Sequence, residues 1–118
     1  MNNFFFKKKK KILNILEFDY VFKKPYVIKN LYFILLSRLN LLKYSRIGFC
    51  INKRNVKYSN IRNYIKRLIR EKFRLYQYQL IPMDFIIIIK NKIIHLNKLN
   101  FISILEEFWF FHYHFLID

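Results

Sequence analysis

Apolar residues recur at helical spacing in three segments of the chain. Residues 12–22 predict a short amphipathic helix, which Pro25 ends. Residues 61–76 predict a longer helix, because apolar side chains return every three or four positions along one face. A third pattern of the same kind, over residues 102–115, predicts a helix near the C-terminus.

Strands are predicted between these helices. Residues 32–39 form an apolar run that is too short for a typical helix. Residues 47–52 alternate strictly, so one face of this strand enters a core and the other carries Gly48, Cys50 and Asn52. We expect it to pair antiparallel with 32–39. Residues 84–90 contain four consecutive isoleucines, which indicates a strand buried on both faces at the centre of the sheet. The predicted order is α-β-β-α-β-α.

Length and composition predict a single folded domain with a basic surface. The chain has 118 residues, of which 54% are hydrophobic, and its formal net charge is +16. Its residue usage favours types with A/T-rich codons, with 19 Ile and 16 Lys. We interpret this skew as the nucleotide bias of a reduced genome. We expect residues 1–11 to form a flexible basic arm, either a frayed terminus or a contact to phosphate, and 12–118 to form the domain.

Cysteine usage and hydropathy predict a cytoplasmic protein. The chain has one cysteine, Cys50, so it has no internal disulfide, and its start lacks a secretory signal pattern. The most apolar long segment, residues 101–117, carries Glu106 and Glu107 at its centre, where charge is costly in a membrane. We therefore predict no membrane-spanning segment, and a membrane is not among the expected partners.

The second predicted helix carries a row of cations beside its apolar face. Ser59 or Asn60 can cap this helix, and the residues that line its charged side are Arg62, Asn63, Lys66, Arg67, Arg70 and Arg74. Because the helix rises about 1.5 Å per residue, positions 62 to 74 span roughly 18 Å, which matches several consecutive phosphates. Between Arg38 and Arg74 there are 12 Lys and Arg and one acid, Glu71. Such a surface indicates a polyanionic partner, and we expect RNA.

Three short motifs stand out in the chain: Arg46-Ile47-Gly48, Asn52-Lys53-Arg54 and the helical segment Arg62-Asn63-Tyr64-Ile65-Lys66-Arg67. With these motifs, the chain from about residue 12 onward resembles the protein subunit of bacterial ribonuclease P, in particular its gammaproteobacterial members. Met83-Asp84-Phe85 and Leu105-Glu106-Glu107-Phe108-Trp109 support it. Tyr64 departs from the family motif, which has an arginine there, so one cation is missing and a ring is gained.

The resemblance implies both a fold and a function. The fold is an α/β (α+β) two-layer sandwich, also seen in a ribosomal-protein domain, with a left-handed β-α-β crossover. The function is that of an accessory subunit of the ribonuclease P endoribonuclease, with ribonuclease P RNA and precursor tRNA as partners. The RNA, with Mg²⁺ bound to it, hydrolyses the phosphodiester and releases the 5′ leader. The protein would then supply no catalytic residue and bind no cofactor itself, and no obligate protein partner is predicted.

Two groups of candidate site residues follow from this resemblance. Phosphates of the catalytic RNA are expected to bind Lys53, Arg54, Arg62, Asn63, Lys66, Arg67 and Arg70, since arginine takes a phosphate bidentately. Leader nucleotides are expected to stack in a cleft on Phe18, Phe22 and Tyr32. Core packing is an equal alternative for the two phenylalanines and the favoured one for Tyr32. Gly48, the only glycine, indicates close approach by RNA or by a neighbouring helix.

The sequence gives no sign of a catalytic or metal centre in the protein. Its seven acids form no evident carboxylate pair for magnesium. His112 and His114 lack a third ligand, and Cys50 is expected to be a buried or cleft-lining thiol. We expect Trp109 to pack in the core. Two other functions remain open: a structural RNA-binding protein of ribosomal type with the same fold, and a peripheral membrane protein.

Overall fold

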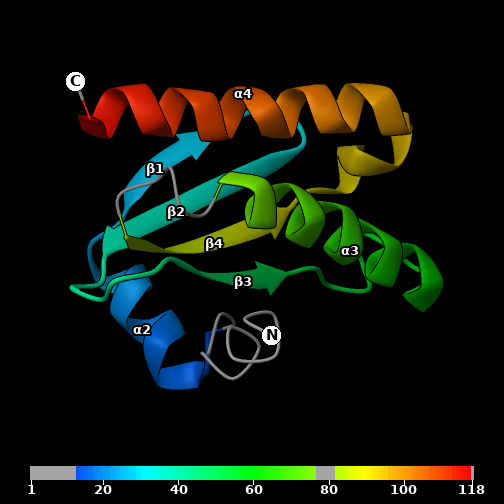
Figure 1. Ribbon diagram of the computed structural model, residues 1–118. Coiled ribbons are helices and arrows are strands. Elements are labelled where there is room, and N and C mark those ends of the chain that lie inside the picture. Colours follow the sequence, from blue (N-terminus) through cyan, green and yellow to red (C-terminus); the bar gives the residue numbers. More distant parts are fainter. Residues whose placement is uncertain (1–12, 77–81, 118) are drawn as a thin grey trace, which may run out of the picture.

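The computed structural model describes residues 13–76 and 82–117, with side chains except at 75–76 and 108–117. Its elements are arranged around one four-stranded sheet (Figure 1). In chain order they are α2 (Ile15–Lys23), β1 (Tyr26–Lys29), β2 (Phe33–Leu39), β3 (Arg46–Cys50), α3 (Ser59–Tyr76), β4 (Met83–Ile89), the 3₁₀ helix η1 (Asn91–His95) and α4 (Lys98–Ile117). The predicted α+β class and the order of its six predicted elements are confirmed.

The strand order in the sheet is β1-β2-β4-β3. The prediction that β4 is central is confirmed, because β4 pairs antiparallel with β2 and parallel with β3. The prediction that β3 pairs antiparallel with β2 is wrong, since β4 lies between them. The cause is that the isoleucine strand is apolar on both faces and is fully covered only in the interior of a sheet, while β3 tolerates an edge.

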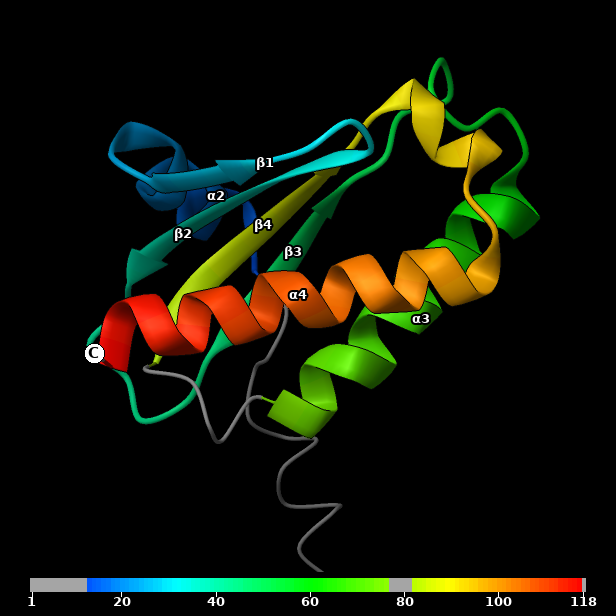
Figure 2. The same cartoon turned by 90° about the horizontal axis from the view of Figure 1, so that it is seen from above.

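The connection from β3 through α3 to β4 is left-handed. Both strands point the same way, and α3 lies on the near side of the sheet in Figure 1, as the view from above in Figure 2 confirms. Connections of this kind are right-handed in nearly all proteins, so the handedness could not be predicted from the hydrophobic pattern. It agrees with the fold that the family resemblance implies.

The strand β1 was not predicted. It has four residues, three of which are exposed, and it pairs with β2 from Tyr26 opposite Ser37 to Lys29 opposite Ile34. A short edge strand that buries little carries no clear alternation, so its pattern did not distinguish it from the loop after Pro25.

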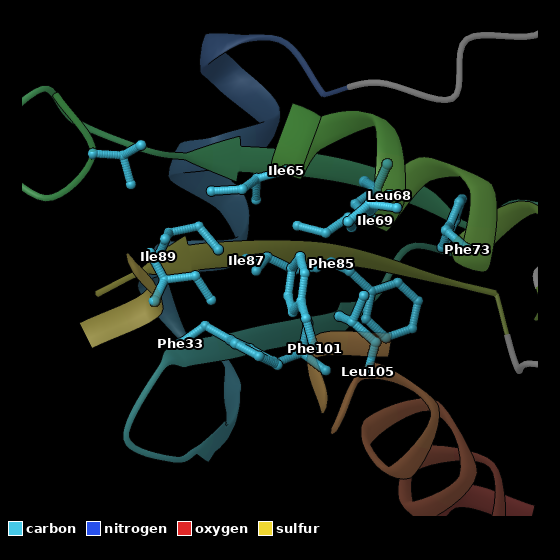
Figure 3. Packing of buried hydrophobic residues seen from close by; sticks show 14 of the residues in the cluster. Phe33, Ile65, Leu68, Ile69, Phe73, Phe85, Ile87, Ile89, Phe101 and Leu105 are labelled. Atoms are coloured by element: carbon cyan, nitrogen blue, oxygen red, sulfur yellow. The ribbon is translucent and has the colours of Figure 1, made fainter. Parts of the chain in front are cut away.

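The main core lies between the sheet and the helices α3 and α4. Figure 3 shows Ile65, Leu68, Ile69 and Phe73 of α3 pointing toward Phe85 and Ile87 of β4, with Phe101 and Leu105 of α4 beside them. The helical spacing predicted these four positions together with Ile61 and Tyr76. Ile61 is 41% exposed, so its prediction as a core residue is wrong, and the side chain of Tyr76 lies outside the described residues. Burying aliphatic and aromatic side chains of this size stabilises the fold by about 1.5–3 kcal/mol each, and this packing fixes the orientation of α3.

The other face of the sheet is covered in part by α2 (Figure 2). Leu13 and Val21 are buried there against Leu36 and Ile86. The predicted amphipathic pattern is wrong at the start of this helix, because Ile15 and Leu16 are 80% and 77% exposed. A capping box between Asn14 and Glu17 fixes its first turn.

Arg46 joins α2 to the sheet. Its guanidinium donates from Nε and Nη2 to the two carboxylate oxygens of Asp84, at 2.8 and 2.7 Å, and from Nη1 to Glu17. Asp84 is fully buried in β4 and also accepts from the amide of Asn40 at 2.9 Å. The hydrogen bond to Asp84 raises the pKa of Arg46 above its ordinary value, so the guanidinium stays charged.

We predict that Arg46→Met lowers the free energy of unfolding by about 3–5 kcal/mol, because it leaves the Asp84 carboxylate buried without a cation. Urea denaturation monitored by circular dichroism measures the loss. The matched control is Lys72→Met, which removes the partly exposed ion pair to Glu106 at 3.5 Å and should cost less than about 1 kcal/mol. Equal losses for the two variants would contradict the role given to Arg46.

Candidate RNA interface

The loop between β3 and α3 presents Lys53 and Arg54 to solvent on a well-defined backbone. Asn52 accepts from the backbone N–H of Asn55 at 3.0 Å, and the side chain of Asn55 donates to the carbonyl of Ile89 at 2.9 Å. Val56 is buried at the base of this loop. Both predicted cations therefore lie at the exposed tip of a turn that is fixed to the end of β4.

Arg62 connects this loop to the first turn of α3. Its Nη1 donates to the carbonyl oxygens of Val56 and Lys57, at 2.9 and 3.0 Å. The sequence predicted a phosphate contact for Arg62, and these hydrogen bonds to the loop were not predicted. The half-buried guanidinium positions the loop, while its remaining N–H groups keep donor capacity for a phosphate.

The other predicted side chains lie further along α3. Asn63, Arg67 and Arg70 are exposed, and Lys66 is half-buried on the same side. The guanidinium carbon of Arg70 lies 5.8 Å from the centre of the Phe49 ring, and that of Arg67 lies 5.4 Å from the Tyr64 ring. Within the described part of the chain, none of the seven predicted residues forms an ion pair. Their charge is therefore available to a polyanion.

The predicted leader residues do not lie together. Phe18 and Phe22 share one side of α2, with ring centres 6.1 Å apart, and Phe22 is 46% exposed. Tyr32 packs against the main core cluster on the opposite face of the sheet, so its inclusion in the cleft is wrong. Because Tyr32 lies just before β2, the alternation of the strand did not determine which face of the sheet its side chain would reach. Core packing was the favoured alternative for this residue.

Gly48 resolves one alternative that the sequence left open. A Cβ atom built on Gly48 would lie 2.5 Å from Cζ of Phe18, so the close neighbour is the ring of α2. Phe18 thus covers the backbone of β3 on the α2 face. Cys50, Ile34 and Ile88 are half-buried on this face, and burial raises the pKa of the Cys50 thiol. The expectation of a cleft-lining thiol is consistent with this position.

Several predictions concern parts of the chain outside the description. The basic arm at residues 1–11 is one, and the side chains of Trp109, His112 and His114 are others. Among the residues that are described, no group of three His, Cys, Asp or Glu side chains is placed to hold a metal ion. In the same residues, no helix is long and apolar enough to cross a membrane.

Sequence reasoning also missed the contacts of Arg46. The signal was a lone acid, Asp84, beside an otherwise apolar strand, since a buried carboxylate requires a cationic or hydrogen-bonding partner. Arg46 lies directly opposite Asp84 in the parallel pairing of β3 with β4. That pairing was not predicted, so the partner could not be identified.

Comparisons with known proteins agree on one family. The sequence model of the family described as Ribonuclease P matches residues 6–111. The chain is 47% identical over 109 residues to the ribonuclease P protein component of Buchnera aphidicola subsp. Schizaphis graminum, covering 92% of this chain and 96% of the relative. It is 39% identical over 104 residues to that of Cronobacter sakazakii, covering 88% and 87%.

A solved structure is similar as well. The RNase P protein of Staphylococcus aureus superposes with a TM-score of 0.78 at 25% identity, covering 84% of this chain and 92% of that one.

A basic α+β protein whose cations gather on one helix and its preceding loop belongs to the class of nucleic-acid-binding proteins. The chain belongs to the ribonuclease P protein family.

Proposed function

We propose that α3 and the loop before it bind ribonuclease P RNA, that the α2 side of the sheet contacts the 5′ leader of precursor tRNA, and that the RNA performs the hydrolysis. Family membership supports the general part of this statement, a protein component of ribonuclease P acting in tRNA processing. The observation that carries the RNA-binding part is the surface of six cations and Asn63 around α3, in which no cation forms an ion pair within the described residues.

The geometry of this surface suits a phosphate backbone. Lys53 and Arg54 stand at one end, on a loop that Arg62 ties to the helix, and Lys66, Arg67 and Arg70 continue along α3. The apolar side of α3 is buried in the main core, so the cations are held on a rigid support. Little ordering is needed on binding, which favours affinity for a fixed RNA surface.

The leader contact is supported by the face that α2 covers only in part. Phe22 offers an exposed ring, and the half-buried Cys50 lies near the end of β3, just before the loop with Lys53. A single strand that stacks on an aromatic side chain here needs no particular sequence, which suits a protein that meets many leaders. Phe18 contributes mainly by packing on Gly48.

Catalysis by the RNA, and not by the protein, is supported by the structural roles of two acids, the buried Asp84 and Glu17. Asp84 and Glu17 approach the same guanidinium, that of Arg46, which ties them to a structural role between α2 and the sheet. Mg²⁺ would then be bound by the RNA, and the protein would act by binding and orienting its partners. We place this activity in the cytoplasm.

The alternative of a ribosomal-type structural protein is not favoured, because the family model, the relatives and the structural neighbour reported above are all ribonuclease P proteins. Reconstitution separates the two functions. The purified chain should restore cleavage of precursor tRNA by ribonuclease P RNA at low magnesium, and the chain alone should cleave nothing. Assembly into ribosomal particles without such rescue would contradict the proposal.

The triple variant Lys66→Ala, Arg67→Ala, Arg70→Ala should bind ribonuclease P RNA at least about tenfold more weakly and lose the low-magnesium rescue. The slope of log affinity against log salt should fall by about two to three units, because each lost phosphate contact removes roughly one. Filter binding across a salt series measures both quantities.

The matched control is the triple variant Lys23→Ala, Lys24→Ala, Lys29→Ala. It removes the same amount of charge from exposed positions at the end of α2, just after α2 and on β1. It should keep most of the affinity, because net charge alone acts only through the long-range field. If both triple variants weaken binding equally, the assignment of the interface to α3 is wrong.

Phe22→Ala should weaken processing of a precursor with a long leader by about 5- to 150-fold, since loss of one base stack costs about 1–3 kcal/mol. A precursor with a leader too short to reach α2 should be processed as by the wild type. Single-turnover kinetics at limiting protein concentration measure both. Ile15→Ala, on the same helix and 80% exposed, is the control. Equal weakening on both precursors would refute leader stacking.

A further inference from the structure

A shallow hollow on the outer side of α3 has chemistry that phosphate binding alone does not use. Its lining combines one aromatic ring, two amides, two guanidinium groups and one aliphatic side chain: Tyr64, Asn60, Asn63, Arg67, Arg70 and Ile61. A site that served only phosphates would need cations and no ring. The ring lies at position 64, where the chain departs from the family motif by lacking an arginine.

Tyr64 forms a fixed platform within this hollow. It is half-buried and packs against the main core cluster, which restrains its ring, while the rest of its surface faces the hollow. An aromatic side chain that is ordered before binding loses little conformational entropy when a base stacks on it. Every nucleobase offers a π-face, so such a platform accepts any of them.

Arg67 lies above this ring without touching it closely. Its guanidinium carbon is 5.4 Å from the ring centre, whereas Arg38 lies only 3.8 Å above the ring of Tyr20. A base between Tyr64 and Arg67 needs a contact of about 3.5–4.0 Å on each side, so Arg67 must move outward by about 2 Å. Arg67 is exposed, and an arginine side chain can make this movement by rotamer changes.

The rim supplies the remaining polar contacts of a nucleotide. Asn60 and Asn63 are exposed, and each amide offers donors and an acceptor that can meet the edge of a base. Arg70 lines the same hollow, and its guanidinium carbon lies 5.8 Å from the centre of the Phe49 ring. From this position it can bind the phosphate of the same nucleotide.

We propose that this hollow binds one unpaired nucleotide of the partner RNA, with its base stacked between Tyr64 and Arg67 and its phosphate on Arg70. This inference rests on the proposed function of α3 as the RNA-binding helix. It adds a contact of a different kind, because a stacked base releases no counterions. Affinity from Tyr64 is therefore insensitive to salt, unlike that from the surrounding cations.

The test compares four full-length variants with the wild type in binding an in vitro transcript of ribonuclease P RNA over a salt series. Tyr64→Leu fills similar space on the core without a ring, and it should bind about 5- to 150-fold more weakly with an unchanged salt slope. Tyr64→Phe keeps the ring and should bind within about twofold of the wild type. Tyr64→Arg should lose the stack but raise the slope by about one unit.

The fourth variant, Tyr26→Ala, removes a half-exposed tyrosine from the opposite edge strand and should bind as the wild type does. Thermal melting by circular dichroism confirms that each variant is folded. Wild-type affinity for Tyr64→Leu, equal loss in Tyr64→Phe and Tyr64→Leu, or a reduced slope in Tyr64→Leu would each overturn the nucleotide site. Absence of binding by the wild type itself would instead refute the proposed function.

Discussion

The packing of one helix that is apolar on one side and cationic on the other underlies both the fold and the proposed interface. The cations of α3 repel one another, and with a formal net charge of +16 the rest of the chain adds to that repulsion. Burial of Ile65, Leu68, Ile69 and Phe73 against the sheet and α4 opposes it. The same burial fixes which way the charges point, so the stability of the core and the geometry of the interface share one set of contacts.

The two faces of the sheet support different regions of the proposed site. One face carries the main core and, through it, α3. The other carries α2, which Arg46 links to Asp84 and on which Phe18 packs closely over Gly48. The strand β3 joins the two regions, because it runs from Arg46 and Gly48 directly toward the loop that holds Lys53 and Arg54. A change at Arg46 is therefore expected to disturb the α2 side more than the cationic surface.

How much the sequence could predict depended on the range of the contacts involved. The course of α3 and the central position of β4 follow from local hydrophobic periodicity, so both were predicted. The parallel partner of β3 and the left-handed crossover depend on long-range pairing, which a single strand pattern does not encode. The four-residue strand β1 buries too little to show a pattern, and the side on which Tyr32 packs depends on a turn.

For the site too, features set by local sequence spacing were predicted, and features that depend on long-range contacts were not. The cations of α3 were found by their four-residue spacing, yet the hydrogen bonds of Arg62 to Val56 and Lys57 required the loop conformation. The ring of Tyr64 was visible as a departure from the motif. Its place in a hollow with Arg67 and two asparagines became evident only when the helix was folded onto the core.

The most direct test of the account is to map which RNA lies against α3. In a Cys50→Ser background, an iron chelate attached at Glu71→Cys, an exposed position on α3, generates hydroxyl radicals that cleave nearby RNA. The same chelate at Val27→Cys, 51% exposed on the opposite edge strand, is the matched probe. The account predicts strong, localised cleavage of ribonuclease P RNA from position 71 and weak cleavage from position 27. Equal cleavage from both positions, or none from position 71, would contradict it.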